Sequence, residues 1–245
     1  MLGRGLRDFL LALQFLTRIP LPLSLPFDAA AQARSLYWYP LVGLLIGALL
    51  WLAAAILPLG MTSAAAVVVL WALITGGLHL DGLADAADAW SGGAGDREKT
   101  LVIMKDPASG PIGVMFVVLV LLMKFAATAD LQAAGEMELL LLAPVLGRGA
   151  VLALLATTPY AREQGIAASM SERLSPPRLL WLLAAVLVIV LVWVGPAVVL
   201  AVSLLVIALR ALMLRRLGGV TGDTLGAAVE LVEAATLALA VWFMA

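Results

Sequence analysis

Long apolar runs are the feature that most limits what this chain can fold into. Of its 245 residues, 64% are hydrophobic and only 13% are charged, far from the balance of a soluble domain. Several runs are long enough to cross the hydrocarbon layer of a bilayer as helices, and in lipid a helix satisfies its own backbone. The sequence therefore predicts an all-α, polytopic integral membrane protein, folded as one membrane-embedded domain over residues 1–245.

About seven transmembrane helices are predicted from these runs. They cover residues 39–59, 62–78, 111–129, 139–157, 179–194, 197–214 and 225–243. The pair Gly195-Pro196 is the weakest divider, because a proline can kink a membrane helix without ending it. The combined run is too long for one crossing, so two spans are expected there.

The amino-terminal segment has a different pattern. Its apolar residues share one helical face, opposite Arg4, Arg7 and Gln14: they are Leu2, Leu6, Phe9, Leu10 and Leu13. This arrangement predicts an amphipathic helix lying in the membrane interface. The aromatic run at residues 37–39, at the entry to the first span, fits an interfacial belt.

Basic residues predict the orientation of the bundle. Lys and Arg occur before the first predicted span and in every second connection after it, whereas segments 58–62, 130–138 and 195–196 have none. The positive-inside rule then puts the amino terminus in the cytoplasm and the carboxyl terminus outside. The net charge of −1 argues against a nucleic-acid partner, and the lack of cysteine excludes disulfides and thiolate metal sites.

Three aspartates at the end of the second predicted span form the most informative motif. Asp81, Asp85 and Asp88 fall within one narrow stripe of a helix, where like charges repel unless a cation compensates them. Ligands that are all oxygen favour Mg²⁺ or Mn²⁺. The plain alternative is a solvated acidic helix end.

A second acidic stretch lies near the carboxyl terminus. Asp223 begins the last span, and Glu230 and Glu233 lie inside it, too deep to be left solvated. Asp223 alone could be a helix cap, but two carboxylate clusters on one side of the membrane would suit a two-metal site. The single histidine, His79, is adjacent to the aspartate stripe. It could act as a base, bind the metal, or be a helix-end residue that is hydrogen-bonded to backbone.

Cationic residues on the same side are candidates for holding phosphate. Lys105 precedes a loop rich in glycine and proline that leads into the third span, and Arg162 follows the fourth. Arg148, between two glycines about mid-span, needs an anionic partner or a ligand. Lys124 is left out of the site, since it can snorkel or pair with Asp130.

These residues predict a metal-dependent membrane enzyme that acts on a phosphorylated substrate from the cytoplasmic side. A cation-coupled transporter also has acidic residues inside its spans, but it needs polar residues across the whole bilayer. Here they concentrate on one side. A CDP-alcohol phosphotransferase also opens its motif with Asp-Gly-x-x-Ala, but here Asp85 follows Ala84 directly and the spacing of that family fails.

Six motifs in the same order resemble those of the cobalamin synthase family, the adenosylcobinamide-GDP ribazoletransferases. They are FLTRIP at 15–20, YPLVG at 39–43, GGLHLDGLAD at 76–85, IMKD at 103–106, YARE at 160–163 and GDTLGA at 222–227. The resemblance implies an enzyme of the bacterial inner membrane that depends on Mg²⁺. It would join adenosylcobinamide-GDP to α-ribazole, or its 5′-phosphate, to give adenosylcobalamin, or its 5′-phosphate, and GMP.

Together the two lines of reasoning give a mechanistic hypothesis. Asp81, Asp85 and Asp88, with Asp223 and Glu230, would hold the metal, and Lys105, Arg148 and Arg162 would hold phosphate. A ribose hydroxyl attacks, and either Asp85 or a member of the Asp223/Glu230 group accepts its proton. Many family members have Ser-Arg where this chain has Pro107-Ala108. The corrinoid could rest against an apolar vestibule beside Trp90, and the oligomeric state, a homodimer included, stays open.

Overall fold

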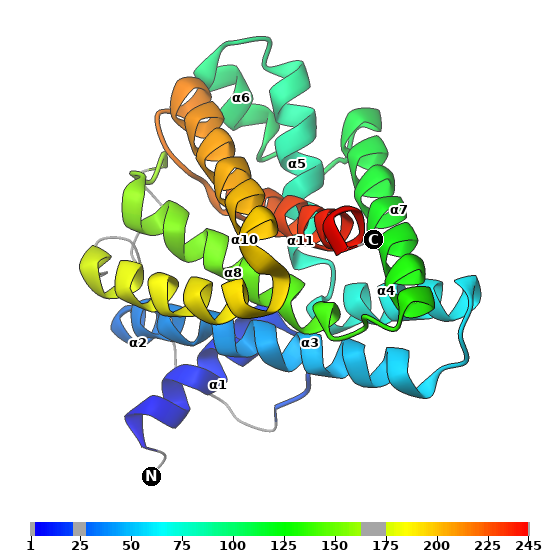
Figure 1. The fold of residues 1–245 in the computed structure, drawn as a ribbon. Coiled ribbons are helices and arrows are strands. Elements are labelled where there is room, and N and C mark those ends of the chain that lie inside the picture. Colours follow the sequence, from blue (N-terminus) through cyan, green and yellow to red (C-terminus); the bar gives the residue numbers. More distant parts are fainter. Residues whose placement is uncertain (1–2, 22–27, 163–174, 245) are drawn as a thin grey trace.

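The computed structural model describes residues 3–21, 28–162 and 175–244, and these are helices joined by turns and short connections (Figure 1). The helices are α1 (Arg4–Leu16), α2 (Ala29–Ser35), η1 (Leu36–Trp38), α3 (Tyr39–Ile56), α4 (Met61–Thr75), α5 (Leu78–Gly92), α6 (Arg97–Ile103), α7 (Pro111–Ala134), α8 (Leu139–Thr157), α10 (Pro176–Leu217) and α11 (Gly222–Met244). The predicted all-α class is confirmed for the described residues.

Five helical stretches are each long and apolar enough to cross a membrane: Ala29–Ile56, Pro111–Ala134, Leu139–Thr157, Pro176–Leu217 and Gly222–Phe243. The helix α5 is outside this set. It forms a pair with α4, bent by 89°, which would count as a sixth span if the two were taken together. The count of five or six is lower than the predicted seven because α4 counts only together with α5 and Pro176–Leu217 counts as one stretch.

The second predicted span is interrupted at Gly76 and Gly77. Both have a left-handed backbone, with φ of 63° and 69°, a conformation that glycine adopts without a steric penalty. The apolar helix α4 therefore stops there, and the chain turns sharply into α5, which carries the aspartate stripe. Gly195, with φ 76° and ψ 169°, likewise breaks α10 into two limbs that correspond to the predicted fifth and sixth spans.

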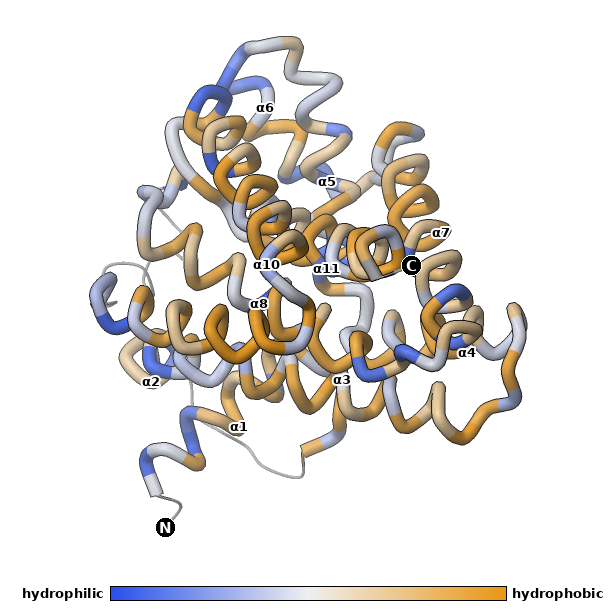
Figure 2. Tube along the Cα trace, viewed as in Figure 1, coloured by the Kyte–Doolittle hydropathy of each residue, from blue (hydrophilic) through white to orange (hydrophobic). Residues whose placement is uncertain are grey.

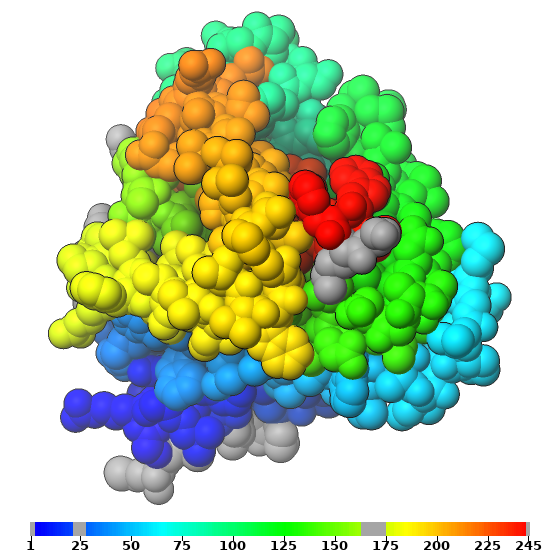
Figure 3. Space-filling model, viewed as in Figure 1, coloured from blue at the N-terminus to red at the C-terminus, as the bar shows by residue number. Residues whose placement is uncertain are grey.

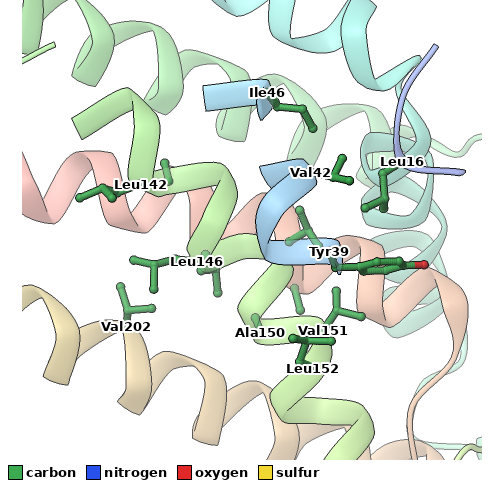
Figure 4. Packing of buried hydrophobic residues seen from close by; sticks show 14 of the residues in the cluster. Leu16, Tyr39, Val42, Ile46, Leu142, Leu146, Ala150, Val151, Leu152 and Val202 are labelled. Atoms are coloured by element: carbon green, nitrogen blue, oxygen red, sulfur yellow. The ribbon is translucent and has the colours of Figure 1, made fainter. Parts of the chain in front are cut away.

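The core lies where α3, α8 and α11 pack together, and Figure 4 shows part of it. The helix α8 contributes most of its side chains to this core, including fully buried Leu140, Leu152 and Leu154. Large apolar side chains of α10 point outward instead, among them Trp181 and Val192 at 78% and 82% exposure. Hydrophobic residues cover much of the traced chain in Figure 2, as expected for a protein whose outer face contacts lipid. On the face of the molecule drawn in Figure 3, α10 and α7 flank the carboxyl-terminal end of α11.

The amino-terminal helix α1 packs against the bundle along part of its length. Leu11, Leu13 and Leu16 are buried, and Asp8 accepts hydrogen bonds from Arg34 of α2, the shorter at 2.8 Å. Leu6 stays exposed at 49%. The helix itself is present as expected, and its place in the membrane interface stays a prediction. Leu2 lies outside the described residues.

Three connections meet at one end of the bundle through arginine side chains. Arg97 of α6 donates to the carbonyl oxygens of Leu217, at 2.8 Å, and Ala161, at 3.0 Å. Arg216 of α10 donates to the carbonyl oxygen of Trp90 at 2.9 Å. The short helix α6, the connection that follows α8 and the basic carboxyl-terminal end of α10 therefore lie together.

Candidate functional site

The two acidic stretches of the sequence meet because α5 packs closely against α11. A Cβ atom built on Gly82 would lie 2.9 Å from the carbonyl oxygen of Asp223 and 3.1 Å from its Cα atom, too close for any side chain. One turn further along α11, Gly226 faces the backbone of His79: a Cβ atom built on Gly226 would lie 3.4 Å from the Cα atom of His79. Small residues allow this approach. As a result, the amino-terminal end of α11 lies beside the aspartate stripe of α5.

A cavity of about 350 Å³ lies at this contact. Its polar lining includes Asp81, Tyr160, Arg162 and Asp223, and its apolar lining comes from α1, η1, α3 and α8. Pockets that combine an apolar wall with a few convergent polar groups are typical of small-molecule sites. The cavity is therefore the candidate active site.

The polar side of the cavity is held by two connections that pair with each other. The amide of Ala161 donates to the carbonyl oxygen of Val220 at 2.8 Å, and the amide of Gly222 donates to the Tyr160 hydroxyl at 3.2 Å. This pairing brings Arg162 to Asp223, with Nη2 2.9 Å from Oδ2. Burial raises the pKa of Tyr160, so its phenol stays neutral at ordinary pH.

Asp85 is the carboxylate whose acidity is most informative. Its pKa is raised from 3.8 to about 6, first by burial and then by the negative charges of Asp81, Asp223 and Asp88, while Arg162 opposes this shift. Charges that raise the pKa of one carboxylate share its electrostatic environment. A cation placed there would be stabilised by the same charges that make the proton bind.

Asp88 contacts the start of α7. It accepts hydrogen bonds from the amides of Gly110, at 2.6 Å, and Gly113, at 2.8 Å. These amides belong to the first turn of α7, which has no intrahelical acceptors for them. Both oxygens of Asp88 therefore cap a helix, a role that the sequence did not indicate, and its assignment as a metal ligand stays a prediction.

The remaining carboxylates suit a Mg²⁺ ion that is bound jointly by the protein and by the phosphates of a substrate. Within the described ranges, no three His, Cys, Asp or Glu side chains are grouped closely enough to hold an ion by themselves. Mg²⁺, however, is commonly bound through one or two carboxylates together with waters and substrate phosphates. Asp81 and Asp85, one turn apart on α5, supply such a pair, and Asp223 lies across the contact between the two helices.

Glu230 and Arg148 belong to a separate buried network. Lys124 of α7 lies 2.7 Å from Glu230 and 2.5 Å from Glu233, and Glu233 also pairs with Arg148 of α8. The four charges cancel, and none of these residues lines the candidate cavity. The structure thus gives Glu230 a lysine in place of a metal and gives Arg148 a glutamate in place of phosphate. The predicted pairing of Lys124 with Asp130 is also wrong.

Lys105 and the predicted vestibule lie elsewhere. Lys105 is exposed in the connection between α6 and α7, and it lines neither this cavity nor the larger one. The larger cavity, about 500 Å³, lies between α5, α7, α10 and α11, and its mostly apolar lining includes Trp90. The α5 residues that line it are on the face of α5 that is turned away from the aspartates.

Sequence reasoning missed the apolar half of the candidate site. Phe15, Leu16 and Tyr39 line the cavity, although Tyr39 was expected in an interfacial belt and is only 3% exposed. Helical periodicity could not have placed them there, because they come from separate elements. Their only sequence signal was membership in the FLTRIP and YPLVG motifs.

Comparisons with known proteins agree along the whole length. Adenosylcobinamide-GDP ribazoletransferase of Pseudomonas putida (strain GB-1) is 52% identical, covering 94% of this chain and 96% of the relative. The protein of the same name from Ectopseudomonas mendocina (strain ymp) is also 52% identical, over 94% and 97%. That of Pseudomonas aeruginosa (strain UCBPP-PA14) is 50% identical, over 95% and 97%. No solved structure matches the chain.

The family match covers the motifs and both acidic helices. The family described as cobalamin-5-phosphate synthase matches residues 8–241, from α1 to the last turns of α11. The chain belongs to the cobalamin-5-phosphate synthase family.

Proposed function

We propose that the protein joins adenosylcobinamide-GDP to α-ribazole, or its 5′-phosphate, and releases GMP. The observation that carries the proposal is the cavity in which Asp81 of α5 and the Arg162–Asp223 pair meet, in a chain about half identical to ribazoletransferases over nearly all its length. The products are adenosylcobalamin, or its 5′-phosphate, and the nucleotide leaving group. Anionic substrates and a carboxylate site need a cation between them, which is consistent with the expected Mg²⁺, or Mn²⁺.

The reaction is a displacement at phosphorus. A ribose hydroxyl oxygen of ribazole attacks the phosphorus bonded to the corrinoid, the bond from that phosphorus to the GMP oxygen breaks, and the hydroxyl proton passes to a carboxylate. Asp85 suits the role of proton acceptor when it does not itself hold the metal, since a pKa of about 6 in the metal-free protein lets it be ionised near neutrality and still bind a proton. Asp223, held by Arg162, is the alternative acceptor.

Asp81 and Asp85, with Asp223 opposite, are the residues that would hold Mg²⁺. When bound, the metal would neutralise negative charge on the diphosphate at the attacked and departing oxygens. Arg162 supplies fixed positive charge on the same cavity wall, and its Nε has no hydrogen-bond partner among the described residues. A phosphate oxygen is the natural acceptor for it. Lys105 stays a proposed phosphate contact from the exposed connection.

The proposed location is the bacterial inner membrane, with the active face in the cytoplasm. Several long apolar helices support a multi-pass membrane protein, and basic residues of α6 and α10 lie beside the connection after α8, which brings Arg162 to the cavity. The proposed site draws its residues from one chain, so it does not depend on a homodimer. The buried charges of α7, α8 and α11 neutralise one another and give no support to a transporter.

A direct assay tests this function. Purified protein in nanodiscs is incubated with adenosylcobinamide-GDP, α-ribazole and Mg²⁺, and GMP and the corrinoid product are quantified. We expect equal amounts of both, and none when EDTA is added or ribazole is left out. GMP release without ribazole would point to hydrolysis, and no GMP from folded protein would overturn the proposal.

A further inference from the structure

Residues from three of the motifs line the candidate cavity without a part in phosphoryl transfer. Phe15 and Leu16 come from the end of α1, Tyr39 from the start of α3 and His79 from the first turn of α5. They line the same cavity as Asp81, Arg162 and Asp223. The cavity therefore has a part suited to phosphate chemistry and another part whose purpose that chemistry does not explain.

The unexplained part is aromatic and apolar. The rings of Phe15 and Tyr39 are stacked, with centroids 6.3 Å apart and planes 21° from parallel. Leu16, Val151 and Leu155 complete this wall, and Figure 4 shows the first two in the same cluster as Tyr39. Flat aromatic ligands bind well on such walls, since they gain contact area at little conformational cost. The wall thus points to a planar apolar group.

His79 is the exception within that wall. It is 6% exposed, and its Nδ1 has no hydrogen-bond partner among the described residues. Buried polar groups are normally hydrogen-bonded, and an unpaired one is costly. The imidazole lines the cavity, so a ligand with one hydrogen-bonding atom on an otherwise apolar ring would remove that cost.

The volume of the cavity limits which substrate this can be. About 350 Å³ is near the lower end of the range for small-molecule sites and suits a nucleoside, whereas a corrin ring with its GDP tail is far larger. Guanine also fits by size, but it has several donors and acceptors on its edges. An apolar wall with one histidine would leave most of them unpaired. The dimethylbenzimidazole of ribazole has two methyl groups and one free ring nitrogen.

We propose that this cavity is the acceptor subsite: the base of α-ribazole lies against Phe15 and Tyr39, and His79 contacts its free ring nitrogen. The ribose is then directed toward Asp81 and Asp223. This inference rests on the proposed function and adds to it the place of the acceptor and the residues that select its base. It also assigns α1 a role as a wall of the site.

A matched pair of phenylalanine variants tests the subsite. Phe15→Ala removes an aromatic contact from this cavity, and Phe116→Ala removes a similarly exposed ring from the larger cavity, at 42% and 39% exposure. Losing one aromatic contact should raise the KM for α-ribazole about tenfold in Phe15→Ala, with little change in kcat or in the KM for adenosylcobinamide-GDP. Phe116→Ala should leave the KM for ribazole unchanged. Phe15→Leu serves in its place if the alanine variant does not fold.

Histidine variants test the polar contact separately. His79→Phe keeps the ring but removes its nitrogens and should raise the KM for ribazole, whereas His79→Gln, which still offers a polar group, should recover part of the loss. A purely structural role would lower kcat and stability together and would not distinguish Gln from Phe. Unchanged ribazole KM in both Phe15→Ala and His79→Phe, with active wild-type enzyme, would overturn the inference.

Direct binding separates this inference from the proposed function. The wild-type protein and both variants in nanodiscs are titrated with α-ribazole alone. Ribazole should bind more weakly to Phe15→Ala and His79→Phe than to the wild type, and GMP should not displace it. Ribazole binding without any transferase turnover would leave the subsite standing and overturn the proposed function. Turnover combined with competition by GMP would assign the cavity to the guanine nucleotide instead.

Discussion

Gly82 of α5 lies directly against the backbone of Asp223 in α11, and this contact joins the two acidic stretches of the chain. A methyl group at residue 82 would lie 2.9 Å from the Asp223 carbonyl oxygen, so the helices would have to separate. We expect Gly82→Ala to cost about 1–3 kcal/mol in stability and to lower kcat as the carboxylates move apart. Thermal unfolding in detergent and the GMP-release assay measure the two effects.

Gly226→Ala is the matched control for that substitution. The added methyl group would lie 3.4 Å from the backbone of His79, an ordinary contact, and alanine favours the helix by up to about 1 kcal/mol. This variant should be as stable as the wild type or more so, and because Gly226 lines the candidate cavity the two variants are compared by stability. Equal damage from both substitutions would show that α5 and α11 do not rely on the close approach at Gly82.

Asp85→Asn should reduce turnover by at least about 100-fold, because it removes a carboxylate that shares the field of Asp81 and Asp223. The amide keeps the size of the side chain, so insertion and thermal unfolding should change little. Glu98→Gln, at an exposed carboxylate of α6, is the control and should keep full activity. Near-normal GMP release by Asp85→Asn would remove Asp85 from the mechanism.

The dependence on Mg²⁺ should vary with pH through Asp85. Its pKa of about 6 is raised, so in the metal-free protein the side chain is mostly protonated below that pH and mostly ionised above it. A proton and a metal compete for the same oxygens. The Mg²⁺ concentration for half-maximal activity should therefore rise up to about tenfold per pH unit below 6 and level off above it. Titrations at fixed ionic strength on both sides of that pH test this, and a flat dependence would contradict it.

Asp88→Ala should destabilise the protein without changing its Mg²⁺ dependence. The substitution leaves the amides of Gly110 and Gly113 without their acceptor, and loss of such a cap costs about 0.5–2 kcal/mol. Asp88→Asn keeps one acceptor oxygen and should fall in between. A large increase in the Mg²⁺ requirement of Asp88→Asn would instead restore the metal role predicted from the sequence.

The sequence was informative where a pattern is local. Apolar runs predicted the positions of α3, α7, α8 and α11 closely, because length and hydropathy alone decide such helices. The helical spacing of Asp81 and Asp85 likewise put both on one face of α5. The bend at Gly76 and Gly77 was missed, since an apolar run looks the same whether it continues or turns.

Partners distant in the sequence could not be predicted in the same way. Periodicity placed Asp88 with the other aspartates, but its partners, Gly110 and Gly113, are set by how α7 packs on α5. Arg148 was recognised as needing an anion, yet nothing in the sequence identified Glu233 rather than a phosphate. Both contacts were missed for one reason: a spacing rule shows which face a charge is on and not which helix lies opposite.

The buried network gives the sharpest test of that packing. Glu233→Gln would leave Arg148, fully buried in α8, without its carboxylate, and unpairing a buried charge costs about 3–5 kcal/mol. The double variant Arg148→Met/Glu233→Gln keeps the pair of Lys124 and Glu230, and its buried network has no net charge. It should therefore be more stable than Glu233→Gln alone. Thermal unfolding in detergent measures both, with Glu136→Gln at an exposed site as the control. If the double variant lost the sum of the two single losses, Arg148 and Glu233 would not depend on each other for stability.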